Sequence, residues 1–111
     1  MGRIGILLNN GDVYVKEGDL SASWVNVNTD VRAFALTDDR IGVIRNNGDA
    51  LVKEGGLSAS WVVENTDVRA IALAGDRIGV LRNNGETLVK KGDLSASWVS
   101  ENNNIIAIAL A

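Results

Sequence analysis

The feature that most constrains this chain is an internal repeat of 37 residues. The repeat is marked by residues that recur at that interval: Trp24, Trp61 and Trp98, and Gly5, Gly42 and Gly79. Three copies, 1–37, 38–74 and 75–111, account for all 111 residues, which we treat as a single repeat domain. A division without remainder suggests an engineered or trimmed chain, and a natural chain with the same division is the alternative. Because a unit this short cannot bury its apolar face alone, we expect a stack of like units.

Each repeat has the pattern of four short β-strands. In the second repeat the alternating segment 40–45 predicts a strand, and Asn46-Asn47-Gly48 after it predicts a hairpin turn, because Asn and Gly both tolerate positive φ. Segments 51–53, 60–63 and 68–73 predict three more strands, separated by glycine-rich or polar turns. Apolar residues nowhere recur at helical spacing over about ten residues, so the chain is predicted to be all-β.

Four short strands in a repeat of about 40 residues are typical of a propeller blade. We therefore predict a β-propeller built from 37-residue, four-stranded blades, with three blades in the chain. A β-trefoil also contains three four-stranded repeats and is the alternative. The trefoil predicts a monomer of 11.8 kDa.

The order of segments in the second and third repeats resembles a known family. The strand Val-Arg-Ala-Ile-Ala-Leu is followed by a short turn, then by Arg-Ile-Gly-Val-Leu-Arg, Asn-Asn-Gly, Thr-Leu-Val-Lys and Ser-Trp-Val. This order is similar to that of the tectonin and tachylectin-like propeller repeats, and the similarity extends over all three copies. The resemblance implies a lectin-like module that binds carbohydrate at repeated sites, without catalysis.

Three blades are too few to close a ring, since propellers typically have four to eight. We expect identical chains to complete it, as a homodimer with six blades or a homotrimer with nine. By analogy with propellers in general, the innermost strands would be 31–36, 68–73 and 105–110, with alanines sharing one strand face. Segment 105–110 would then pair with segment 3–8 of a neighbouring chain, because an unpaired strand edge exposes a row of hydrogen-bonding groups.

The composition excludes several classes of function. The chain has no cysteine, so it cannot form a disulfide, and no histidine, the commonest general base and metal ligand. The serines near each tryptophan therefore have no histidine to activate them as nucleophiles. We expect no enzymatic activity and no cofactor. A net charge of −3 gives no reason to expect a nucleic-acid partner.

The sequence shows no segment that would place the chain in or across a membrane. The longest apolar run is too short to span a bilayer, and no signal-peptide pattern opens the sequence. We therefore expect a soluble protein without a membrane partner, and the sequence does not indicate a compartment.

The three tryptophans, Trp24, Trp61 and Trp98, are candidates for carbohydrate binding, because an aromatic face can stack on a sugar ring. The alternative is a tryptophan in the body of a strand that packs between blades, with its indole N–H on a backbone carbonyl. Lys16, Lys53 and Lys90 also recur, and we expect them at solvated strand positions.

A second candidate site is polar and occurs twice. It consists of an aspartate and two arginines in each copy: Asp30, Arg32 and Arg45, and Asp67, Arg69 and Arg82. These residues would line a pocket for a polar ligand, or form a charge network in which the aspartate relieves two neighbouring arginines.

The polar set is lost at the predicted seam between chains. The equivalent residues there are Asn104, Ile106 and Leu8. A contact between chains favours such a joint change, although the ends of repeat arrays are often atypical for capping reasons.

Two functions are therefore carried forward. One is carbohydrate binding at repeated, shallow sites, where multivalency raises avidity. The other is a structural role, as a designed or reconstructed scaffold that self-assembles and has no natural ligand.

Overall fold

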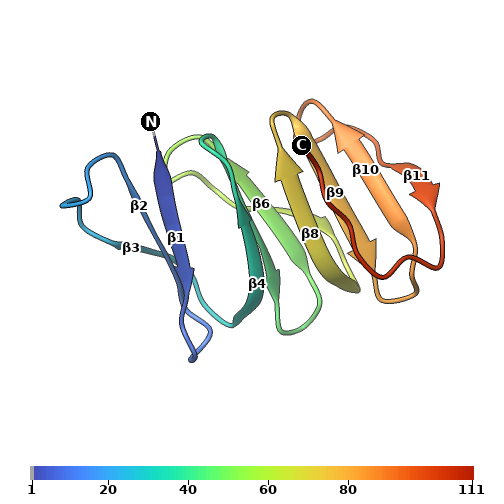
Figure 1. Cartoon of the computed structure of the whole chain (residues 1–111), viewed down its shortest axis with the longest axis horizontal. Helices are drawn as coiled ribbons and strands as arrows, with labels where there is room; N and C mark the ends of the chain where they lie inside the picture. Colours follow the sequence, from blue (N-terminus) through green and yellow to red (C-terminus); the bar gives the residue numbers. More distant parts are fainter. Residues whose placement is uncertain (1) are drawn as a thin grey trace.

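The computed structural model describes residues 2–111, and within that range it is all-β, without helices. Three separate antiparallel sheets stand side by side along the longest dimension of the molecule (Figure 1). The first sheet contains β1 (Arg3–Leu7), β2 (Val13–Glu17) and β3 (Val25–Asn28). The second contains β4 (Val31–Leu36), β5 (Arg40–Arg45), β6 (Ala50–Glu54) and β7 (Val62–Asn65). The third contains β8 (Val68–Ala74), β9 (Arg77–Arg82), β10 (Thr87–Lys91) and β11 (Val99–Asn102).

Two of the predicted strands differ from the observed ones. β7 begins at Val62, so Trp61 lies just before the strand and not in its body. The bulge between Ala50 and Leu51 shifts the register of this outer strand. The predicted strand 105–110 is not a strand in the single chain, because no partner strand pairs with it among residues 2–111.

The β5–β6 turn confirms the predicted hairpin but not its backbone conformation. The amide of Gly48 donates to the carbonyl of Arg45, and the amide of Arg45 donates to the carbonyl of Asp49, both at 2.9 Å. Gly48 has a φ of 93°, whereas Asn47 does not have positive φ. Instead, the Asn47 side chain accepts a hydrogen bond from the Asp49 amide at 3.0 Å. The loop therefore has three residues and needs a left-handed conformation only at the glycine.

The sheets approach closely where a glycine in one faces an apolar side chain of the next. A Cβ on Gly5 would lie 2.7 Å from Phe34, and a Cβ on Gly42 would lie 2.9 Å from Ile71. Glycine is therefore required here by the neighbouring sheet and not by its own strand. The predicted alternation along the inner strand is confirmed in β4, because Phe34 and Leu36 pack against the core shared with the first sheet, whereas Ala33 packs against the core shared with the third.

Each interface between sheets has its own buried apolar core. The core between the first and second sheets contains Val13, Val15, Val31, Ile41 and Val43. The core between the second and third sheets contains Ile44, Ala50, Val68 and Val80.

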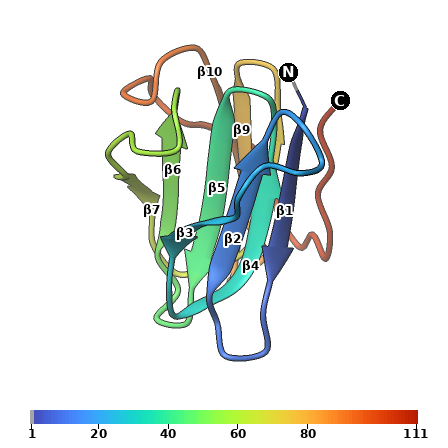
Figure 2. The same cartoon turned by 90° about the vertical axis from the view of Figure 1, so that its left-hand side faces the viewer.

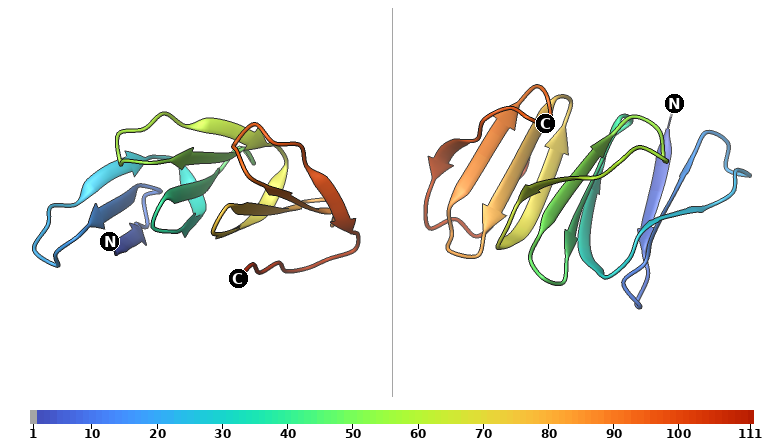
Figure 3. Two further views of the ribbon diagram at one scale, coloured as in Figure 1. Left: turned by 90° about the horizontal axis from the view of Figure 1, so that it is seen from above. Right: turned by 180° about the vertical axis from the view of Figure 1, so that it is seen from behind.

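Seen from above, the three sheets follow one another along an arc (Figure 3, left). Their first strands, β1, β4 and β8, are neighbours in space. No sheet within residues 2–111 closes on itself, so the barrel that a trefoil requires is not present in this part of the chain. None of the described residues form a helix long and apolar enough to cross a membrane.

Candidate functional site

The tryptophans lie at the interfaces between sheets. The indole nitrogen of Trp61 donates to the carbonyl of Val27 in the first sheet, and that of Trp98 donates to the carbonyl of Glu64 in the second, both at 3.1 Å. Both rings are half-buried. Trp24 has no such acceptor within residues 2–111 and is 40% exposed. Two of the three tryptophans therefore make the interface contact that was one of the two interpretations of the sequence.

A lysine lies over each tryptophan ring. The ammonium nitrogens of Lys16, Lys53 and Lys90 lie 4.8 to 4.9 Å from the ring centroid in their own repeats. Each ammonium also donates to the carbonyl of a leucine four residues further on. These two contacts, one of them a cation–π interaction, hold the loop that carries the tryptophan. We did not predict this contact from the sequence; the constant spacing of lysine and tryptophan in every repeat is the signal that could have indicated it.

Lys53 and Lys90 are buried, so the expectation of solvated positions is wrong for them. Lys90 forms an ion pair with Glu64 of the second sheet, and both side chains are buried. One repeat earlier the residue equivalent to Glu64 is Val27, and Lys53 forms no ion pair with any of residues 2–111. Burial, and secondly the positive charge of Arg3, lower the pKa of Lys53 below its ordinary value.

The aspartates of the polar set contact asparagine and not arginine. A carboxylate oxygen of Asp30 accepts a hydrogen bond from the Asn46 side chain at 2.7 Å, and Asp67 accepts one from Asn83 at 2.7 Å. Both aspartates have positive φ, at the links between sheets. Among residues 2–111 no ion pair joins either aspartate to an arginine. The expected charge network is therefore wrong.

Each of the four arginines of the set is directed elsewhere. Arg32 and Arg69 lie at β-bulges, and each donates to a backbone carbonyl of the next repeat, on Val68 and Ile105 respectively. Arg82 pairs with Glu86 at 3.6 Å, while the buried Nε of Arg45 has no hydrogen-bond partner within residues 2–111. No hydrogen bond or ion pair in this range joins the polar set to the tryptophans.

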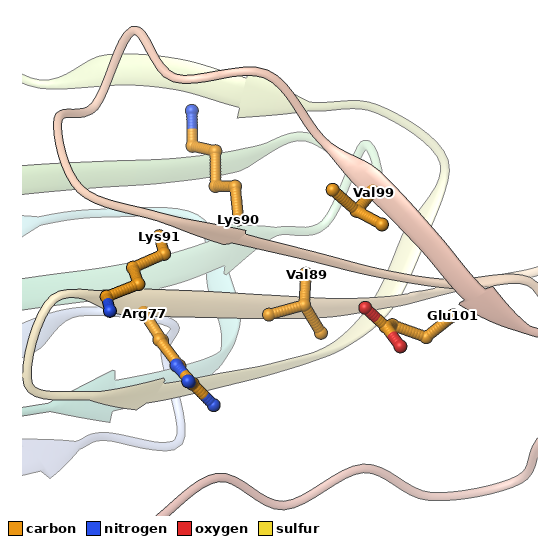
Figure 4. Close-up of a pocket in the computed structure, with 6 residues that line it drawn as sticks. All are labelled: Arg77, Val89, Lys90, Lys91, Val99 and Glu101. Atoms are coloured by element: carbon orange, nitrogen blue, oxygen red, sulfur yellow. The ribbon is translucent and has the colours of Figure 1, made fainter.

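A hollow lies on the outer face of the third sheet (Figure 4). It is lined by Arg77, Val89, Lys90, Lys91, Val99 and Glu101. The bulge between Thr87 and Leu88 places Glu101 out of the regular register of β11. The Glu101 side chain lies on the same side of β10 as Val89 and Arg77, away from the ammonium of Lys90. This hollow was not anticipated from the sequence.

At the opposite end of the molecule, no other sheet of residues 2–111 covers the outer side of the first sheet (Figure 2), and apolar side chains are exposed there. This uncovered face consists of five residues, each between 37% and 78% exposed: Ile4, Ile6, Leu8, Leu20 and Trp24. Apolar groups collected on one face indicate an interaction surface.

Neither a known protein family nor a curated protein matches the sequence. Among residues 2–111 no three acidic side chains gather in a way that would hold a metal ion.

Proposed function

We propose that this protein is a lectin-like β-propeller module without catalytic activity, in which identical chains close a ring of six or nine blades. The observation that carries the assembly is the position of segment 105–111. A Cβ on Gly79 would lie 2.7 Å from Ile108, which repeats the contact of Gly5 with Phe34. The amide of Ile105 donates to the carbonyl of Gly85 at 3.1 Å, just as Val31 donates to Gly11 at 2.9 Å. Segment 105–111 therefore lies against the third sheet as an inner strand lies against the sheet before it.

A neighbouring β1 would complete this segment as a strand. β1 is an edge strand of the first sheet, and its outward residues Ile4 and Ile6 are 40% and 37% exposed. In the proposed ring, Asn9 of the next chain would meet Asn104 as Asn46 meets Asp30. Asn104 has a φ of 60°, close to the 58° of Asp30, and its amide oxygen is a suitable acceptor.

The proposed ligand is carbohydrate, bound weakly at equivalent places around the ring. The proposal is supported by the resemblance to tectonin and tachylectin-like repeats and by the recurrence of a partly exposed tryptophan beside exposed serines in each repeat. A ring of six or nine such places would give avidity from weak individual sites.

A glycan array and a native mass measurement test the two parts of this proposal separately. We expect a mass of two or three chains, and binding that Trp98→Phe weakens while the mass stays unchanged. A single-chain mass would refute the ring, and an array without binders at high protein concentration would refute the lectin function.

A second candidate is a self-assembling scaffold without a ligand. It is favoured by the engagement of each tryptophan, since a lysine covers one ring face and the indole nitrogens of Trp61 and Trp98 are bonded to backbone carbonyls. An intact ring that binds no glycan is the expected result for this candidate.

A further inference from the structure

The two interfaces inside the chain differ by one ion pair. Both contain the tryptophan-to-carbonyl bond, made by Trp61 to Val27 and by Trp98 to Glu64. Only the interface between the second and third sheets adds a carboxylate, because Glu64 faces Lys90 there. Its two side chains are 2% and 4% exposed, so the pair is shielded from water and from salt.

The outer faces of the molecule carry the two halves of this pair. Glu101 is the equivalent of Glu64 one repeat later, and it lines the hollow on the third sheet (Figure 4). Lys16 is the equivalent of Lys90 in the first repeat, and its ammonium lies 4.8 Å from the Trp24 ring centroid. Glu101 is exposed in the single chain, and Lys16 pairs with no carboxylate within residues 2–111.

We infer that Glu101 of one chain pairs with Lys16 of the next chain, whose Trp24 donates its indole N–H to the Glu101 carbonyl. The inference rests on the proposed ring and deepens it by naming the partner of each group. The hollow beside Val89 is then the place that Trp24 and Leu20 of the neighbouring chain fill. In the single chain Leu20 is 78% exposed, whereas its equivalents Leu57 and Leu94 are partly buried.

The occupant is a second copy of this chain because the unfilled groups on the two outer faces are complementary. One face offers an ammonium, an indole N–H and apolar side chains, and the other offers a carboxylate, a carbonyl and a hollow. The interface of the second and third sheets brings the same groups together within one chain.

Charge reversal tests this pairing. Once the pair is buried, leaving one charge unpartnered is strongly unfavourable. We expect Glu101→Lys and Lys16→Glu each to weaken assembly at least tenfold, measured as the concentration at which rings dissociate, and the double variant to recover most of it. Asp38→Lys makes the same charge change in an exposed turn and is expected to leave assembly unchanged. Glu101→Gln is expected to weaken assembly less, because Val27 shows that this position tolerates a neutral residue.

A mixture of the two single variants adds a test that depends on ring size. In the mixture, the wild-type Lys16 of one variant meets the wild-type Glu101 of the other, and the two reversed charges meet at the opposite contact. Contacts between two copies of the same variant bring like charges together, so the chains pair only in alternation. If the wild-type ring has two chains, the mixture must reassemble; if it has three, the mixture must not close a ring, because an odd ring cannot alternate. The opposite result in either case would overturn the pairing.

The ring and the pairing fail in distinguishable ways. A wild-type protein with the mass of one chain refutes the ring itself. If both single variants still form the ring, or if the double variant does not restore it, the pairing of Lys16 with Glu101 is refuted. The ring of the wild-type protein is not refuted by either result.

Discussion

β1 and β5 have nearly the same sequence pattern and opposite environments. Ile4 and Ile6 on β1 are 40% and 37% exposed, whereas their equivalents Ile41 and Val43 on β5 are at most 1% exposed. Both strands form the same hairpin with the strand that follows, in the same register. The difference therefore comes from the neighbouring sheet, which covers β5 and is not there for β1 in the single chain.

The other end of the molecule shows the same difference in polar groups. Glu64 is buried against Lys90, whereas its equivalent Glu101 is exposed beside the hollow of the third sheet. Only the second repeat has a sheet on each side among residues 2–111, and the comparison teaches that the burial of equivalent residues depends on those neighbours. An apolar face that is uncovered in the single chain indicates an interaction surface, and the sheet that covers β5 shows what kind of partner would fit it.

The largest expected effect comes from deleting residues 105–111, because this removes the segment that would pair with β1 of the next chain. We expect the native mass to fall to that of a single chain, while the circular dichroism signal of the sheets is retained. That signal is the control against simple unfolding. A truncated chain that still forms the full ring would show that the pairing between chains is not made by this segment.

The next largest effect compares Trp61, which lies between two sheets, with Trp24, which lies on the uncovered face of the first sheet. Trp61→Ala opens a cavity inside the chain and is expected to cost about 3 kcal/mol in the free energy of unfolding measured with urea. Trp24→Ala is expected to cost less than about 1 kcal/mol in the single chain and to raise the concentration at which rings dissociate. Equal stability losses for the two variants in a single chain would contradict the assigned difference.

The sequence predicts the strands well because the hairpins are local. The period of two in segment 40–45 and the glycine at the turn are enough to place β5 and β6. The position of β7 is less well predicted, since it depends on the bulge between Ala50 and Leu51 and not on the pattern of β7 itself.

The site is less predictable because burial depends on the next sheet. Lys53 has the sequence context of a solvated strand residue, yet the loop with Trp61 covers it. Asp30 has two arginines nearby in the pattern, but its left-handed backbone and the following turn bring it to Asn46. The positions of such groups follow from the packing of sheets, which a single repeat does not encode.

Threonine at equivalent positions of the covered strand β5 and the uncovered strand β1 is expected to have a smaller effect. Val43→Thr buries an unpartnered hydroxyl and is expected to lower the free energy of unfolding by about 2 kcal/mol. Ile6→Thr lies on the uncovered face and is expected to change the stability of the single chain by less than about 0.5 kcal/mol. In the ring, however, Ile6→Thr is expected to promote dissociation. If Val43→Thr were as mild as Ile6→Thr under dissociating conditions, the contrast between the covered and uncovered faces would not hold.

The smallest expected effect is on the pH dependence of the free energy of unfolding. It concerns Lys53, which faces Val27 where Lys90 faces Glu64. Because burial lowers the pKa of Lys53, the folded chain releases this proton at a lower pH than the unfolded chain, whose lysine has its ordinary value of 10.5. Below the folded pKa the cost of burying the charged lysine is present in full, and as pH rises toward 10.5 the cost is relieved, so stability increases. Val27→Glu would give Lys53 the carboxylate that Glu64 gives Lys90, raise the pKa of Lys53 and reduce this increase. Urea unfolding of the two proteins between neutral pH and pH 10.5 measures the difference, in which the remaining titrating groups cancel to first order. A wild-type profile no steeper than that of Val27→Glu would mean that Lys53 reaches water or another anion in the folded chain.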